Sequence, residues 1–164
     1  MKKVLLLFIP IILNSCGNEG NGAKVEDRSG YTGTTTGIPT TPLSELGIRF
    51  DGHYKEQVQD VVYLIRFFPN GHAVLINGMQ DVANELPAYL RQDAIGDPVM
   101  GWYNVPVTVQ GDSIFFRTYP EKGEISYRGV VPSTSMVRLL RHSHINGTRS
   151  IKEYIFQPDA ASRQ

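Results

Sequence analysis

The chain has 164 residues, of which 41% are hydrophobic and 20% charged, proportions typical of a globular protein with one core. Sixteen basic residues balance sixteen acidic ones, so no broad basic field is present to hold phosphates, and nucleic acid is not an expected partner. A single cysteine excludes an intramolecular disulfide, so the core must stabilise the domain.

The amino terminus is typical of an export signal. Lys2 and Lys3 precede an apolar run over residues 4–13, which as a helix would be about 15 Å long, roughly half of what a bilayer core requires. A positive start, a short apolar run and small residues behind it predict a secretory leader over residues 1–15 that is removed.

The end of this leader carries the single cysteine. The sequence Leu13-Asn14-Ser15-Cys16 resembles the lipobox of bacterial lipoproteins, which implies diacylglycerol on the Cys16 thiol, cleavage before Cys16 and acylation of the new amino terminus. Each buried methylene contributes about 0.8 kcal/mol, so two or more acyl chains hold a protein at a membrane. The alternative is a free or structural cysteine behind an ordinary leader.

The residue after the cysteine bears on the destination of the protein. Gly17 is similar to the residues that lipoprotein sorting rules associate with the outer membrane. We therefore expect a lipid-anchored protein of the cell envelope, at the outer membrane, with the membrane as its partner through the anchor. Whether the domain faces the periplasm or the outside is left open.

A segment poor in large apolar residues follows. It is rich in Gly, Thr, Asn, Ser and Pro, as in "GYTGTTTGIPTTP", and cannot bury enough surface to offset the entropy of ordering. We predict that residues 16–46 form the lipidated cysteine and a flexible tether, with an end-to-end distance of roughly 30 Å. The alternative is a glycosylated or partner-binding stalk.

From residue 47 to residue 158, short runs of β-branched and aromatic residues alternate with turn formers such as "PNG", "QGD" and "EKG", a pattern that predicts strands joined by hairpins. Eight candidate strands cover residues 48–57, 60–68, 72–76, 102–109, 113–119, 124–131, 136–142 and 150–157. A disordered tail is expected over residues 159–164.

One segment between the third and fourth candidate strands has helical spacing. Its apolar residues recur as on one helix face: Val82, Leu86, Tyr89 and Leu90. Pro87 is compatible with a helix if Asn84 is the N-cap, because the proline then lies in the first turn, where no intrahelical amide bond is lost. The sequence therefore predicts one short helix over residues 84–92.

Eight strands connected in order can remove their exposed edges by closing into a barrel. Gly52-His53-Tyr54 is similar to the Gly-x-Trp of lipocalins, and "IRFFPNGHAVL", "VQGDSIFF", "YRGVV" and "YIFQP" resemble segments of lipocalin-like domains in small envelope lipoproteins. The resemblance spans most of residues 47–158. It implies a mainly β fold, a single antiparallel meander of about eight strands closed into a lipocalin-like barrel.

Two arginines of the seventh candidate strand suggest a site. Arg138 and Arg141 are three residues apart, so on a regular strand they point to opposite faces and one points toward the interior. If Val137 and Leu139 face inward, Arg141 joins them near the rim, where it could receive an anionic or polar ligand. The alternatives are a bulge, an early strand end, or stacking on an aromatic such as Tyr54.

Strand alternation makes most aromatic residues of the predicted barrel core residues, and some of them candidates for lining a pocket. The candidate ligand-binding residues are Arg141, Tyr63, Tyr127 and Tyr154. His142 and His144 share a strand face, but the sequence identifies no third metal ligand, and solvated histidines are the favoured interpretation.

These observations favour a non-catalytic protein. The sequence contains no Gly-x-Ser-x-Gly elbow and no glycine-rich loop between a strand and a helix, and we expect neither an enzyme nor a cofactor beyond the lipid on Cys16. The expected function is that of a binding module for a small apolar or amphipathic molecule. The alternative is a structural or protein-interaction lipoprotein with a filled barrel, which docks an envelope partner through its outer face.

Overall fold

The computed structural model describes residues 42–159. The predicted leader, Cys16, residues 17–41 of the predicted tether and residues 160–164 of the predicted tail lie outside the described residues, so export and lipidation stay predictions. In the described range, no helix is long and apolar enough to cross a membrane.

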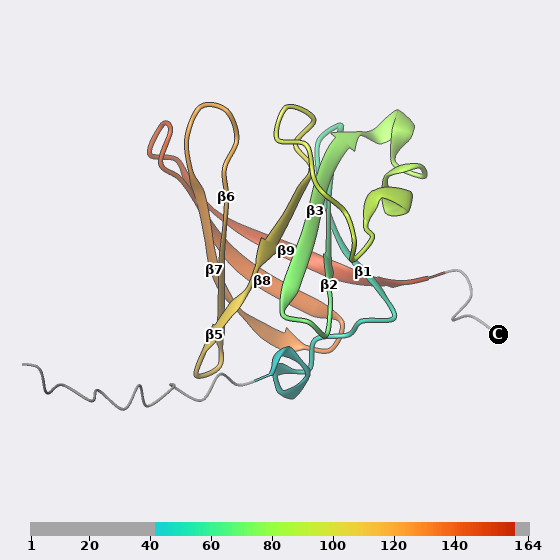
Figure 1. The fold of residues 1–164 in the computed structure, drawn as a ribbon, viewed down its shortest axis with the longest axis vertical. Helices are drawn as coiled ribbons and strands as arrows, with labels where there is room; N and C mark the ends of the chain where they lie inside the picture. Colours follow the sequence, from blue (N-terminus) through green and yellow to red (C-terminus); the bar gives the residue numbers. More distant parts are fainter. Residues whose placement is uncertain (1–41, 160–164) are drawn as a thin grey trace, which may run out of the picture. The chain divides into compact units, whose positions relative to one another are not determined.

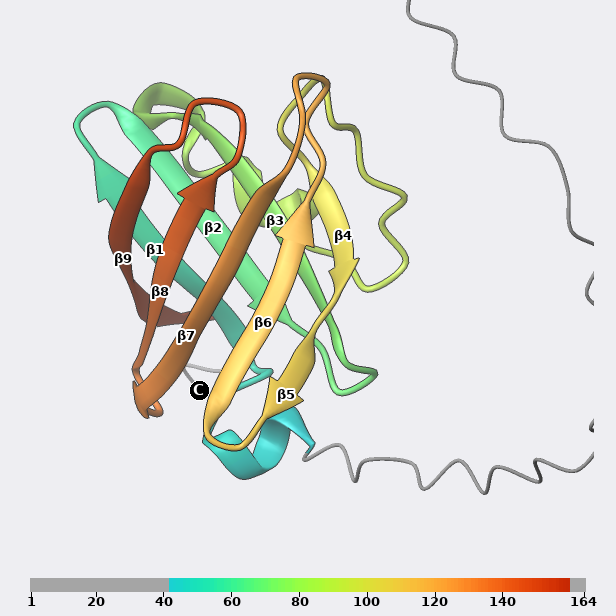
Figure 2. The same ribbon diagram turned by 90° about the vertical axis from the view of Figure 1, so that its left-hand side faces the viewer.

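The described chain forms one antiparallel sheet that rolls into a nearly closed barrel (Figure 1, Figure 2). Every strand pairs with its neighbour in sequence except β4 with β5, and the first strand also pairs with the last, in the order β4-β3-β2-β1-β9-β8-β7-β6-β5. The predicted mainly β meander is therefore confirmed. The strands are β1 (Gly52–Val58), β2 (Val61–Phe67), β3 (His72–Met79), β4 (Tyr103–Pro106), β5 (Thr108–Gln110), β6 (Ser113–Thr118), β7 (Ile125–Ser133), β8 (Met136–Ser143) and β9 (Arg149–Pro158).

There are nine strands rather than about eight because the predicted strand over residues 102–109 is divided at Val107. The part before Val107, β4, pairs with β3, and the part after it, β5, pairs with β6. Pro106 ends β4 and has no amide hydrogen for a ladder bond, and the Val107 amide donates to the carbonyl of Gly71 at 2.8 Å. The two free edges of the sheet thus belong to one bent segment.

Two apolar clusters follow from alternation along the strands. In β2, Ile65 and Phe67 point into the barrel, whereas Val62 and Leu64 are buried on its outer side. A strand that is apolar on both faces needs cover on both. The outer cover comes from the connection between β3 and β4, which packs Leu86 and Leu90 against β2 and β3.

The predicted helix over residues 84–92 is wrong. Within residues 42–159 the connection contains two short 3-10 turns, η2 (Gln80–Val82) and η3 (Leu86–Tyr89), and the residue before η3 is Glu85, with no side-chain cap from Asn84. A helix of nine residues is marginal without strong packing, and this one has two anchors, Leu86 and Leu90. Leu86 packs tightly against β3, since a Cβ on Gly78 would lie 3.0 Å from Leu86 Cδ2.

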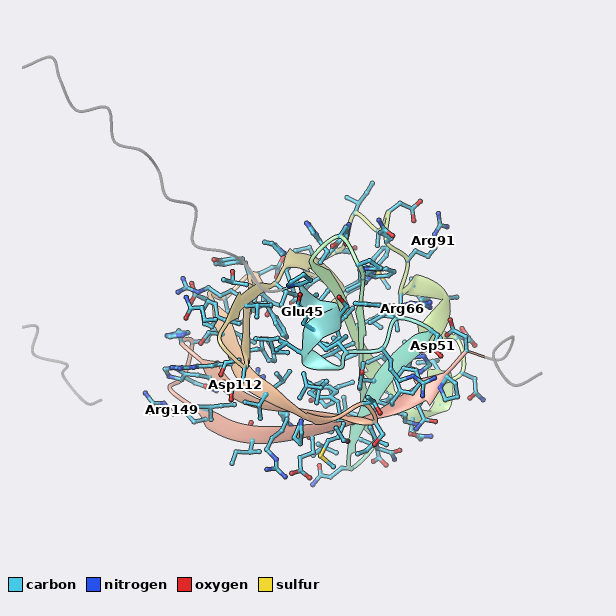
Figure 3. All side chains as sticks on the ribbon, turned by 90° about the horizontal axis from the view of Figure 1, so that it is seen from below. Glu45, Asp51, Arg66, Arg91, Asp112 and Arg149 are labelled. Carbon is cyan, nitrogen blue, oxygen red and sulfur yellow. The ribbon has the colours of Figure 1, made fainter. Side chains whose placement is uncertain are left out.

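A third 3-10 turn, η1 (Leu43–Leu46), lies across one end of the barrel, as the view from below shows at Glu45 (Figure 3). Leu43 and Ile48 are buried in the same cluster as Tyr54. The Tyr54 hydroxyl accepts a hydrogen bond from the Arg49 amide at 2.9 Å. The barrel core therefore includes Leu43, which the sequence analysis placed in the predicted tether. The segment around η1 covers this end of the barrel.

At the other end of the described chain, Asp159 forms hydrogen bonds with the barrel, although the sequence predicts a disordered tail from residue 159. Its carboxylate accepts a hydrogen bond from Arg66 Nη2 at 2.9 Å, and its amide donates to the carbonyl of Asp51. Nearby, β1 begins at Gly52 rather than at residue 48. A Cβ on Gly52 would lie 2.2 Å from the carbonyl oxygen of Gln157, so a glycine is needed where β1 approaches β9.

Candidate functional site

The barrel interior contains a cavity of about 80 Å³ toward the end opposite η1. Polar side chains from seven strands line it: Tyr63, Asn77, Tyr103, Thr118, Tyr127, Arg141 and Tyr154. Apolar walls come from Ile65, Leu75 and Ile125. The structure thus brings all four candidate ligand-binding residues to one cavity, and their role in binding stays a prediction. Its volume is well below the roughly 300–1,000 Å³ of pockets that enclose drug-sized ligands, so it has room for a small group.

The two arginines of β8 have opposite orientations. Val137 and Leu139 are fully buried in the core, and Arg141, at the same parity, lines the cavity. Arg138 lies on the outer face, where its Nε donates to Glu153 Oε1 at 2.8 Å. Among residues 42–159 no carboxylate pairs with Arg141, so its guanidinium is the uncompensated charge of the interior.

An ion pair lies beside this cavity that the sequence analysis did not identify. Lys152 Nζ is 3.2 Å from Glu56 Oε2, and the two side chains are 14% and 13% exposed. The contact is an ion pair rather than an aligned hydrogen bond, and Lys152 Nζ also lies 5.1 Å from the centroid of the Tyr63 ring. Strand parity could have placed Lys152 inside, since it is two residues from buried Tyr154, but not its pairing with Glu56.

Burial keeps two tyrosines of the cavity protonated. Burial raises the pKa of Tyr127, while the nearby Arg141 lowers it by a smaller amount. The pKa of Tyr154 is raised well above its ordinary value of 10.0, first by burial and then by Tyr127 and Glu56. Both hydroxyls are therefore neutral near pH 7 and can donate hydrogen bonds, but they cannot neutralise Arg141.

Thr118, the last residue of β6, adds a further polar group. Its side chain is 1% exposed, and its Oγ1 is buried without an aligned hydrogen-bond partner in the described part of the chain. It lies near enough to the Tyr127 hydroxyl to lower the pKa of that group slightly. Because a buried unpaired hydroxyl costs free energy, this group marks a place where a partner is expected. No sequence signal distinguishes it from an ordinary strand threonine.

The two histidines of the β8–β9 region lie together outside the cavity. The ring centroids of His142 and His144 are 4.1 Å apart, and His144 Nε2 lies 2.9 Å from Ser126 Oγ and 3.6 Å from Glu124 Oε1. Over residues 42–159, no three His, Cys, Asp or Glu side chains are grouped to hold a metal.

The cavity therefore combines a guanidinium that has no carboxylate partner among the described residues with neutral hydroxyls and an apolar wall. Comparison of the chain with models of protein families, with curated proteins and with solved structures found no match. Function must then be argued from the chemistry of the site itself.

Proposed function

We propose that the protein is an exported, lipid-anchored protein of the cell envelope whose lipocalin-like barrel binds a small apolar or amphipathic molecule. The observation that carries this proposal is the cavity toward the end of the barrel opposite η1, where Arg141 and four tyrosines meet an apolar wall. Pockets that bind small molecules share this composition, mostly apolar with a few convergent polar groups.

The size of the cavity limits how a ligand could be bound. About 80 Å³ corresponds to a few water molecules at about 30 Å³ each in the liquid. The enclosed space therefore suits one end of an amphipathic molecule, with the remainder directed toward the mouth. Ile125, at the start of β7, lines the cavity and is partly buried, so a larger side chain there should obstruct it.

Native mass spectrometry of the full chain, purified from its own host, tests the binding proposal. We expect a retained small molecule in the unsubstituted protein and in the control Ile151→Trp, because Ile151 is 68% exposed on the outer face of β9. Ile125→Trp should lose the molecule. A protein that carries no small molecule, or one that Ile125→Trp retains, contradicts binding in the cavity.

The anchor is tested separately through Cys16. We expect the mature amino-terminal peptide to begin at Cys16 and to carry acyl chains, and Cys16→Ser to move the protein from the membrane fraction to the soluble one. An unmodified thiol, or retention of residues 1–15, contradicts the anchoring proposal and leaves the binding proposal unaffected.

A second candidate function, docking of an envelope protein, is favoured by the outer face of the sheet. Leu140 and Ile151 are cross-strand partners on β8 and β9 and are 45% and 68% exposed, and Ile155 is 44% exposed. Exposed apolar groups side by side are typical of interaction surfaces. A co-purifying protein that is lost with Ile151→Lys, in the absence of a bound small molecule, favours this function over the first.

A further inference from the structure

In the half of the barrel that contains the cavity, opposite η1, the charges of the inward-pointing side chains do not sum to zero. Lys152 and Glu56 neutralise each other at 3.2 Å, whereas Arg141 has no carboxylate partner among the described residues and lines the cavity instead. The hydroxyls around it belong to tyrosines that burial keeps neutral. Arg141 is partly buried, and a guanidinium that has lost part of its hydration is stabilised by an anionic partner. The interior therefore carries one positive charge for which a monoanion is the matching partner.

A second and independent observation indicates where this partner would bind. Thr118 Oγ1 is buried, has no aligned partner over residues 42–159 and lines the same cavity as Arg141. Arg141 and Thr118 reach the cavity from β8 and β6, on the two sides of Tyr127 in β7, which is the cross-strand partner of Arg141. A guanidinium, a hydroxyl and a phenol therefore converge on one small space.

Size and charge favour a carboxylate over a phosphate. A phosphate monoester carries about −1.5 to −2 charges near pH 7, more than the single uncompensated charge of Arg141, while a carboxylate carries one. A planar carboxylate also matches the paired donors of a guanidinium. The walls formed by Ile65, Leu75 and Ile125 suit an apolar substituent on the acid.

We propose that the barrel cavity binds the carboxylate group of a small amphipathic organic acid, with Arg141 and Thr118 as its hydrogen-bond donors and the apolar part against Ile65, Leu75 and Ile125. This inference rests on the proposed binding function and narrows its ligand class. Arg138, on the same strand but on the outer face and paired with Glu153, has no part in it.

The test compares two probes of the same shape, hexanoate and hexanamide, by equilibrium dialysis against the full chain bearing Cys16→Ser. Hydrogen bonds to charged groups contribute enough for roughly a 10- to 100-fold preference. We expect hexanoate to bind more tightly than hexanamide by this factor. Arg141→Gln should remove the preference, Thr118→Val should reduce it several-fold, and Arg138→Gln should leave it unchanged.

Each outcome separates this inference from the proposed function. Equal binding of both probes, or a preference that survives Arg141→Gln, overturns the carboxylate site. Binding of neither probe also overturns it, and the retained molecule seen by native mass spectrometry then decides whether a neutral ligand upholds the broader function. Thermal melts show whether Arg141→Gln and Arg141→Lys are still folded. Arg141→Lys is a further control, because it keeps the positive charge and should retain part of the preference for hexanoate.

Discussion

At the level of single residues, the barrel interior near the cavity contains charged side chains in addition to apolar ones. Lys152 and Glu56 form an ion pair between β9 and β1, with both side chains largely removed from water. Such a pair is weak evidence for stability, because desolvation offsets most of the attraction. The free energy of unfolding should fall when one partner is removed, because the other charge is then left without compensation.

Substitutions at this pair should therefore be strongly non-additive. We expect Lys152→Met to lower the free energy of unfolding by about 3 kcal/mol, because Glu56 is left unpaired, and the double variant Lys152→Met, Glu56→Leu to recover most of this loss. Urea denaturation of the four proteins measures the cycle. The control is the exposed pair Arg138 and Glu153, about half exposed on the outer face, where single substitutions should cost about 0–1 kcal/mol. Additive losses at Lys152 and Glu56 contradict the pairing.

His53 gives the fold a pH dependence. Burial lowers the pKa of His53 below its ordinary value of 6.5, Asp159 opposes this shift, and Arg66 and Lys55 add to it. The unfolded chain therefore takes up this proton first as the pH falls. The stability contribution of neutral His53 is complete above about pH 6.5 and is lost as the pH falls through the lowered pKa of the folded state.

The expected result is a urea midpoint that decreases between pH 7.5 and pH 5, with a smaller decrease in His53→Gln. His142→Gln should keep most of the decrease, because that imidazole lies near the surface, although its pKa is also lowered. An unchanged pH dependence in His53→Gln shows that other groups cause it.

At the level of elements, the approach of β7 to β8 depends on Gly129. A Cβ at this position would lie 1.9 Å from the backbone oxygen of Arg138, a distance that no side-chain rotation can relieve. We expect Gly129→Ala to lower the free energy of unfolding by about 3 kcal/mol. In the matched control, Gly111→Ala, the new methyl group meets nothing within 4 Å but the backbone has φ +61°, which should cost about 1 kcal/mol. Chemical denaturation compares the two, and equal losses contradict the close approach.

The sequence predicted elements well where local chemistry decides them. "PNG" and "NG" mark turns between alternating segments, and the strands around them occur as expected. The predicted helix was wrong, and the predicted strand over residues 102–109 was wrong in part, because tertiary contacts determine the structure of both segments. The apolar spacing around Leu86 reflects two contacts with the outer face of β2 and β3 rather than a continuous helix face. Pro106 divides a segment whose composition reads as one strand.

At the level of the whole molecule, parity and strand order together explain the site. Alternation predicts which side chains point inward, and the meander order brings Tyr127, Arg141 and Tyr154 onto three adjacent strands. Tyr127 is the cross-strand partner of Arg141, and Tyr154 pairs with Val137, four residues before Arg141. The cavity could therefore be anticipated from the sequence. The unpaired hydroxyl of Thr118 and the Lys152–Glu56 pair could not, because each depends on a three-dimensional neighbour that alternation does not specify.

The barrel is held least firmly where its sheet is interrupted. Seven residue pairs join β8 to β9, but four join β3 to β4 and three join β5 to β6. β4 and β5 form the edges of the sheet and are not paired with each other. Regions with few backbone bonds open at free energies below that of global unfolding.

We therefore expect the amides of residues 103–110 to exchange with solvent at least about tenfold faster than those of residues 136–143, as measured by hydrogen exchange and mass spectrometry on the full chain. Tyr103 of β4 lines the cavity, so a retained ligand should slow exchange in residues 103–106 more than in residues 108–110. Equal protection of β4 and β8 means that packing between β4 and β6 closes the barrel as firmly as a ladder of hydrogen bonds. In that case the entry route for a ligand lies at the mouth alone and not along the interrupted edge.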